Sequence, residues 1–128
     1  MSGMTVSRER SFIAGADLSS SQYRYVKHGS TQNQVVVATS GTDKIIGVLL
    51  NAPKLGWEAT VGLLNGSGTY QIVASAAIAK DAYVTATTGG KEVTTTTAGN
   101  VVAGQALEAA AADGDLIEIM PMNFHHKA

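Results

Sequence analysis

The side chains that could do chemistry in this sequence are few and poorly grouped. The three histidines are His28, His125 and His126, and the last two are neighbours near the end of the chain. A metal site needs several histidines or carboxylates at defined spacing, and a pair of terminal histidines alone does not provide it. We therefore predict no metal ligands, and we interpret His28, which precedes Gly29, as a solvated turn residue.

A pair of aspartates is the second candidate. Asp113 and Asp115 flank Gly114 between two apolar runs. Two such carboxylates could take part in acid–base catalysis or hold Ca²⁺. Aspartates around a glycine are also typical of turns, and we favour the turn.

Nucleophile and phosphate-binding motifs are missing from the sequence. The chain has no cysteine, which excludes disulfides, thiol catalysis and cysteine-ligated zinc. No serine lies in a G-x-S-x-G motif. The run TGGK at Thr88–Lys91 lacks the first glycine, the hydroxyl after the lysine and the helix of a phosphate-binding loop. We predict that the protein is not an enzyme, has no catalytic residues and binds no cofactor.

The charge balance argues against two classes of partner. Nine Lys and Arg residues oppose ten Asp and Glu residues, for a net charge of −1, whereas nucleic-acid binding needs a basic excess. No apolar run reaches the ~18 residues that span a bilayer, and the N-terminus lacks the apolar region of a secretory signal. We predict no nucleic-acid partner, no membrane association and synthesis in the cytoplasm.

The core is predicted to be built from small residues. The hydrophobic fraction is 45%, but aromatic residues make up only 5%. Alanine and valine bury little apolar area per residue, and a domain of this size buries only about two-thirds of its unfolded surface. We therefore expect a further surface to contribute, most simply a homo-oligomer.

The residue pattern predicts an all-β fold. Short runs rich in Val, Ile, Thr and Tyr alternate with Gly, Asn and Asp. The turn Asn65–Gly68 predicts a hairpin between its flanking strands, and Gly89-Gly90 predicts the tip of another. Residues 1–15 are polar and mixed, so we predict an extended N-terminal arm. Residues 16–121 are predicted as the β domain and residues 122–128 as a C-terminal tail.

The β domain contains an internal repeat, over about residues 16–63 and 74–121. The matched positions are Tyr25-Val26 with Tyr83-Val84, Val35 with Val93, Gly41 with Gly99, Gly47 with Gly104, Gly56 with Gly114, and Val61 with Ile119. Two copies are too few for a solenoid. The repeat predicts a small closed β-barrel or sandwich with two-fold pseudo-symmetry, similar to a β-tulip, because closure removes unpaired strand edges.

One stretch of the repeat has a conflicting local preference. The sequence GQALEAAAADG, at Gly104–Gly114, is rich in helix formers. The matching stretch Gly47–Gly56 contains Pro53, which a helix interior does not tolerate. We predict a strand followed by a loop in both copies.

Two short segments resemble lipoyl carrier domains, which are two-fold β structures themselves. TDKI at Thr42–Ile45 is similar to their lysine-bearing hairpin, and GDLIEI at Gly114–Ile119 is similar to their Gly-Asp strand. In that family the Gly-Asp strand precedes the lysine, and here it follows it. A small carrier or binding module, lipoyl-like with Lys44 modified or carbohydrate-binding, is the alternative interpretation.

A resemblance of greater extent covers nearly the whole chain after Phe12. The segments GADLSSSQYRYVKHG, VVVATSGTDKIIGVLLNAPKLGWEATVGLLNGSGTYQIVASAAIAKDAYVTA and AGNVVAGQALEAAAADGDLIEIM closely resemble the capsid decoration, or cement, proteins of tailed bacteriophages. Lys80 departs from the glycine common at its position in that family, and the stretch after Pro121 is unmatched.

The resemblance implies a structural virion protein on the outer surface of the phage head. Such a protein would bind the major capsid protein, cement its adjacent subunits and self-associate, with a trimer favoured. On this basis we predict a capsid or oligomer contact formed by Arg8, Arg10, Phe12, Ile13 and Trp57.

Overall fold

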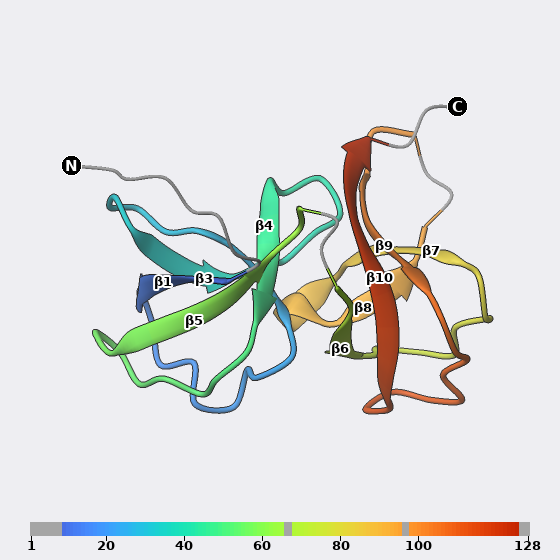
Figure 1. Ribbon diagram of the computed structural model, residues 1–128, viewed down its shortest axis with the longest axis horizontal. Coiled ribbons are helices and arrows are strands. Elements are labelled where there is room, and N and C mark those ends of the chain that lie inside the picture. The colour runs from blue at the N-terminus through green and yellow to red at the C-terminus, as the bar shows by residue number, and fades with distance from the viewer. Residues whose placement is uncertain (1–8, 66–67, 96–97, 126–128) are drawn as a thin grey trace.

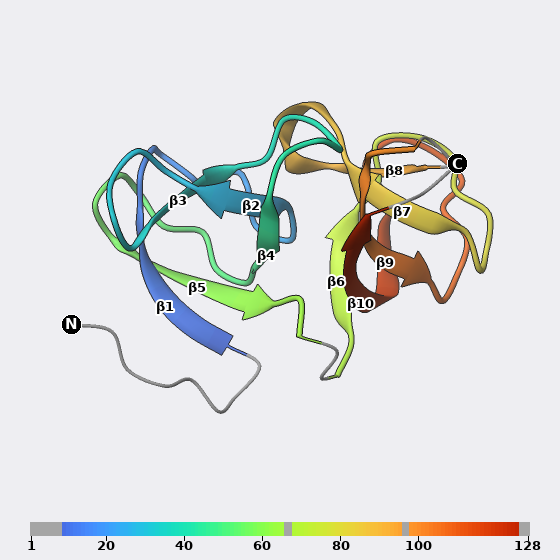
Figure 2. The same ribbon diagram turned by 90° about the horizontal axis from the view of Figure 1, so that it is seen from above.

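The computed structural model describes residues 9–65, 68–95 and 98–125, and it has two β lobes side by side (Figures 1 and 2). The elements are β1 (Glu9–Ala14), β2 (Tyr25–His28), β3 (Gln34–Val37), β4 (Ile45–Leu49), β5 (Glu58–Leu63), β6 (Tyr70–Val73), β7 (Tyr83–Ala86), the 3₁₀ turn η1 (Thr88–Gly90), β8 (Glu92–Thr94), β9 (Val101–Ala106) and β10 (Leu116–His125). The all-β prediction is confirmed.

The first lobe is a closed barrel with the strand order β1-β3-β2-β4-β5, here called the first barrel. β1 closes it, because this strand runs parallel to β3 and antiparallel to β5. Closure leaves no exposed strand edge. The interior holds one aromatic ring among aliphatic side chains: Phe12, Ala14, Leu18, Val26, Val35, Leu49, Ala59 and Val61.

The N-terminal arm was predicted to extend through Gly15, and the structure corrects this boundary. Glu9–Ala14 forms β1, with Phe12 and Ala14 buried in the barrel core. The alternation of exposed Ser11 and Ile13 with buried Phe12 and Ala14 is the period-2 pattern of a half-buried strand. Residues 1–8 of the predicted arm lie outside the described residues. The predicted tail is corrected as well, since β10 continues to His125 and pairs there with Val101.

The second lobe is a five-stranded sheet with the order β6-β10-β9-β7-β8, here called the second sheet. In the described part of the chain its outer strands β6 and β8 are joined by one parallel bridge, Ala74 to Glu92. Replacing β1 to β5 by β6, β7, β8, β9 and β10 in turn gives the same neighbours in both lobes. The internal repeat is therefore structural, and it begins at β1 and β6, before the predicted starts at residues 16 and 74.

Equivalent backbone hydrogen bonds establish the register between the two copies. Gly56 N–H donates to Ala14 O at 2.9 Å, and Gly114 N–H donates to Ala74 O at 2.8 Å. Both glycines have positive φ, 82° and 94°, which favours glycine at this position. Most predicted matches are confirmed by the strand pairing, but Val35 is equivalent to Glu92 and not to Val93, since Val35 pairs with His28 and Glu92 with Ala86.

The turn at Asn65–Gly68 was predicted to be a hairpin, and this prediction is wrong. β5 pairs with β1 and β4, so both of its edges are occupied, and β6 pairs with β10 in the other lobe. The segment is the link between the lobes. The hairpin predicted around Gly89-Gly90 is confirmed by the β7–β8 pairing. The stretches Gly47–Gly56 and Gly104–Gly114 each form a strand followed by a loop, as predicted.

The outer wall of the first barrel packs over the gap between β6 and β8. The cluster at this junction combines Tyr25, Ala38, Ile45, Val48 and Leu64 of the first lobe with the core of the second sheet, which includes Tyr70, Ile72, Val84, Ala103, Ile117 and Ile119. Backbone bonds fasten the two lobes, from Val73 N–H to Tyr23 O at 2.9 Å and from Val101 N–H to Gly41 O at 2.8 Å.

A buried carboxyl lies at this junction. The Tyr25 hydroxyl contacts Glu92 Oε1 at 3.4 Å, and both residues are fully buried. The other oxygen, Glu92 Oε2, has no hydrogen-bond partner among the described residues. Burial raises the pKa of Glu92 to about 8, because an apolar environment disfavours the charged form. Burial and the adjacent carboxyl also raise the pKa of Tyr25. Glu92 is therefore protonated at neutral pH.

Glu92→Gln is expected to flatten the pH dependence of stability. Between about pH 4.5 and pH 8 the folded protein holds a proton that the unfolded chain has released, so the free energy of unfolding falls as pH rises through this window. The slope approaches about 1.4 kcal/mol per pH unit. Urea titrations of both proteins across the window should diverge, and parallel curves would contradict the assignment.

Deletion of residues 1–15 is expected to unfold the first barrel, because it removes β1 and the buried side chains Phe12 and Ala14. Deletion of residues 2–8 keeps every described contact of β1 and serves as the matched control. Circular dichroism during heating measures the result. A cooperative transition retained by the longer deletion would show that β1 is dispensable for the fold.

Candidate functional site

The first barrel exposes a few large apolar side chains. Leu55 is 64% exposed and Trp57 is 61% exposed. Both belong to the loop between β4 and β5, which runs alongside β1, where Ile13 is exposed and pairs with Glu58. We call Ile13, Leu55 and Trp57 the Trp57 patch.

The backbone holds this loop firmly against the barrel. Ala14 N–H donates to Trp57 O at 2.9 Å, and Ala14 O accepts from Gly56 N–H. Pro53 is buried, and its carbonyl accepts from Leu18 N–H at 2.9 Å. The Lys54 ammonium lies 5.5 Å from the centre of the Trp57 ring, within cation–π range. The loop therefore presents two large apolar groups on a fixed backbone, and such groups lose little entropy on binding.

The predicted contact residues divide between the surface and the core. Ile13 and Trp57 are exposed, and Arg10 is partly exposed, where it donates to Asn33 Oδ1 at 3.1 Å and lies 4.5 Å from the Phe12 ring centre. Phe12 is only 4% exposed, so its inclusion in a contact surface is corrected: its side chain packs the barrel interior. Arg8 lies outside the described residues. Leu55 was not among the predicted contact residues, although it lies on the same loop as Trp57 and is exposed.

The polar candidates have structural roles. Asp115 Oδ2 accepts from the backbone N–H groups of Ala111 and Ala112 at 2.7 and 3.2 Å, which closes the loop before β10. Asp113 binds Lys91 at 2.8 Å, and this partner lowers the pKa of Asp113. Among the described residues, no His, Cys, Asp and Glu side chains gather in a group that could hold a metal ion.

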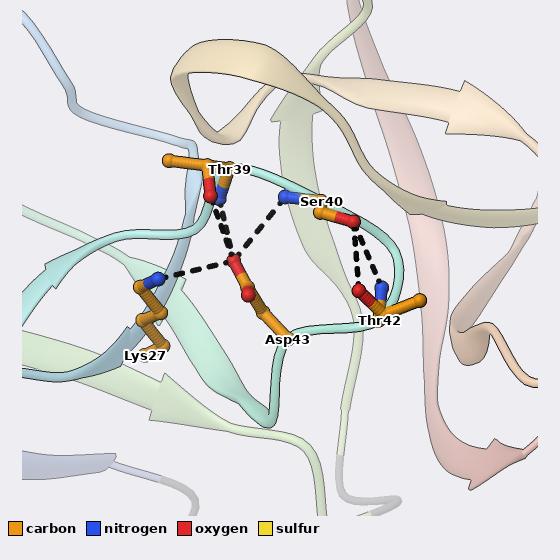
Figure 3. A network of polar contacts seen from close by, with 5 residues as sticks. All are labelled: Lys27, Thr39, Ser40, Thr42 and Asp43. Atoms are coloured by element: carbon orange, nitrogen blue, oxygen red, sulfur yellow. Dashed lines mark hydrogen bonds and ion pairs between the residues drawn. The ribbon is translucent and has the colours of Figure 1, made fainter.

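A comparable carboxylate orders the connection between β3 and β4 (Figure 3). Asp43 Oδ2 accepts from Thr39 N–H at 2.8 Å and Ser40 N–H at 3.2 Å, and it pairs with Lys27 Nζ at 3.3 Å. These contacts lower the pKa of Asp43, with the Thr39 backbone bond as the main cause. The next residue, Lys44, does not sit on a lipoyl-type hairpin, because β2 lies between β3 and β4.

A groove of about 540 Å³ runs between the lobes. Its lining includes Tyr23 and Leu50 from the first lobe and Glu108 and Glu118 from the second. Glu118 accepts from the Thr69 hydroxyl at 2.6 Å, and Glu108 accepts from the Glu118 backbone N–H at 2.9 Å. Both carboxylates therefore support the fold around the groove.

A second exposed apolar surface lies on the second sheet, and sequence reasoning missed it. Tyr83 is 42% exposed, and Leu107 and Met120 are each 39% exposed. We call these residues, with the partly buried Gln105 between them, the Tyr83 face. The sequence of β10 could have predicted this surface. Glu118 lies between Ile117 and Ile119, which point inward, so the alternation places Met120 on the outer face.

Comparison with known proteins gives the family and the fold. The model of the family described as phage cement protein matches residues 21–121. No curated protein matches the chain. The solved structure titled as the head fiber gp8.5 N base of bacteriophage phi29 is similar, with a TM-score of 0.70 over 92% of this chain and 98% of that chain. Its sequence identity is 19%, so it shows a shared fold.

Two further findings describe the helices of the chain and the extent of the family match. In the described part of the chain, no helix has the length and apolar character required to cross a membrane. The family match covers both lobes, from just before β2 to within β10. The chain therefore belongs to the phage cement protein family, whose members are structural proteins of the phage head.

Proposed function

We propose that the protein binds the outer surface of the phage head and cements adjacent subunits of the major capsid protein. The observation that carries the proposal is the Trp57 patch. Leu55 and Trp57 are exposed, lie on a loop fixed by backbone bonds, and contribute nothing to either core cluster. Tryptophan is enriched among the residues that dominate binding energy in protein interfaces.

The rest of the molecule fits this role. A closed barrel joined to a second sheet by an apolar junction is a rigid part, and many equivalent copies on one shell multiply a modest affinity for each site. We also propose that the protein acts as a homo-oligomer, with a trimer favoured. The small-residue core and the two exposed apolar surfaces support this part of the proposal.

The test is co-sedimentation with expanded, undecorated heads of the cognate phage. Wild-type protein should saturate at a fixed simple ratio of copies to capsid subunits. Trp57→Ala should weaken binding about thirtyfold, the equivalent of about 2 kcal/mol, with an unchanged melting transition. Leu116→Ala removes an exposed leucine from the second sheet and is the matched control.

The outcomes separate the function from the surface. Absence of wild-type binding to intact heads would reject the decoration function. If Trp57→Ala saturates the heads at the same concentrations as the wild type, the decoration function stands, but the Trp57 patch is not the contact. Equal losses in Trp57→Ala and Leu116→Ala would likewise reject a contact specific to this patch.

A further inference from the structure

A polar hollow lies on the first barrel, between β1 and the turn that joins β2 to β3. Its volume is about 450 Å³, and it is lined by Arg10, His28 and residues 29–33. Backbone bonds fix the turn in place. Ile13 N–H of β1 donates to Asn33 O at 2.7 Å, and Gly29 N–H donates to Gln34 O at 2.8 Å. The hollow therefore has a defined frame beside β1.

The two basic side chains of the hollow lie against one aromatic ring. The Arg10 guanidinium is 4.5 Å from the centre of the Phe12 ring, and the centre of the His28 ring is 6.0 Å from it in an edge arrangement. Arg10 also donates to Asn33 Oδ1 at 3.1 Å. Because Phe12 is anchored in the core of the first barrel, its ring holds both basic groups at one site.

These basic groups are not neutralised by nearby acids. In the described part of the chain, neither Arg10 nor His28 forms an ion pair with a carboxylate, whereas Lys27 pairs with Asp43. The residues that line the hollow include no Asp or Glu. A guanidinium has five N–H donors, and the printed bond to Asn33 uses only one nitrogen of Arg10. The hollow is thus a basic site on a chain whose net charge is −1.

The shared fold of the two lobes does not require basic residues at these positions. Counting back along β1 and β6 from their equivalent parallel pairings, Arg10 corresponds to Tyr70. Along β2 and β7, His28 corresponds to Ala86. Tyr70 and Ala86 are both buried core residues. The basic character of the hollow is therefore a property of the first barrel, and the repeat does not account for it.

We propose that the hollow binds a carboxylate side chain of an acidic polypeptide segment. A guanidinium and a carboxylate form short, charge-assisted hydrogen bonds, and the imidazole of His28 can donate a further bond. Ser30 and Thr31 are exposed at the rim, where their hydroxyl groups can bond the backbone of the segment.

The size of the hollow supports a polypeptide as the source of the carboxylate. A volume of about 450 Å³ lies within the range of pockets that hold drug-sized molecules, and a free inorganic anion would fill only a small part of it. The inference adds a site to the proposed function and does not depend on it, so its test uses the purified protein without heads.

Titration with a hexaglutamate peptide, followed by ¹H–¹⁵N NMR at constant ionic strength, tests the site. The amide signals of residues 28–33 should shift and saturate. Arg10→Gln should weaken binding about tenfold, because it removes the charge-assisted pair. Lys54→Gln removes the same charge from an exposed position of the first barrel outside the hollow. This matched control should bind the peptide as the wild type does.

Three results would overturn the proposal. The first is the absence of saturable shifts in the hollow, and the second is an equal loss of binding in Arg10→Gln and Lys54→Gln, which would indicate general charge attraction. The third is tighter binding of inorganic phosphate than of the peptide. If Arg10→Gln melts early, His28→Gln, at an exposed position, takes its place and should also weaken binding. None of these results bears on binding to heads.

Discussion

The structure depends on the insertion of one barrel wall into the gap of an incomplete sheet. Among the described residues β6 and β8 meet at one bridge, and the first barrel covers the remaining opening with Tyr25 and Val48. The first barrel has its own interior cluster, whereas the core of the second sheet includes five side chains from the first lobe. The second sheet is thus completed by its partner lobe, and the chain folds as one unit although its sequence contains two copies of one pattern.

The buried carboxyl at this junction follows from the same constraint. In the first barrel the equivalent position is Val35, a plain core residue. In the second sheet the position faces the inserted Tyr25, and Glu92 approaches its hydroxyl at 3.4 Å. A neutral carboxyl is tolerated at this buried position, because burying a charged carboxylate costs far more free energy than burying the protonated group.

Sequence patterns predicted where strands form better than which strands pair with one another. Gly47, Gly56 and their matches identified the repeat because backbone approach and positive φ leave a visible glycine signature. The hairpin at Asn65–Gly68 failed because turn chemistry is local, whereas the choice of neighbour for β5 depends on β1, which is distant in sequence. Phe12 was assigned to the surface for a related reason: its burial depends on closure of the barrel. Trp57 was predicted as a contact residue from the family resemblance, and the structure shows it exposed on the loop beside Gly56.

The junction also determines how force would pass through the molecule. The link between β5 and β6 is one connection between the lobes, and the bonds from Val73 to Tyr23, from Val101 to Gly41 and from Arg24 to Gly89 are others. These connections cross the same junction and would carry a load together. A pull between the two lobes would therefore be shared across the whole contact, which gives the molecule the mechanical character of a brace.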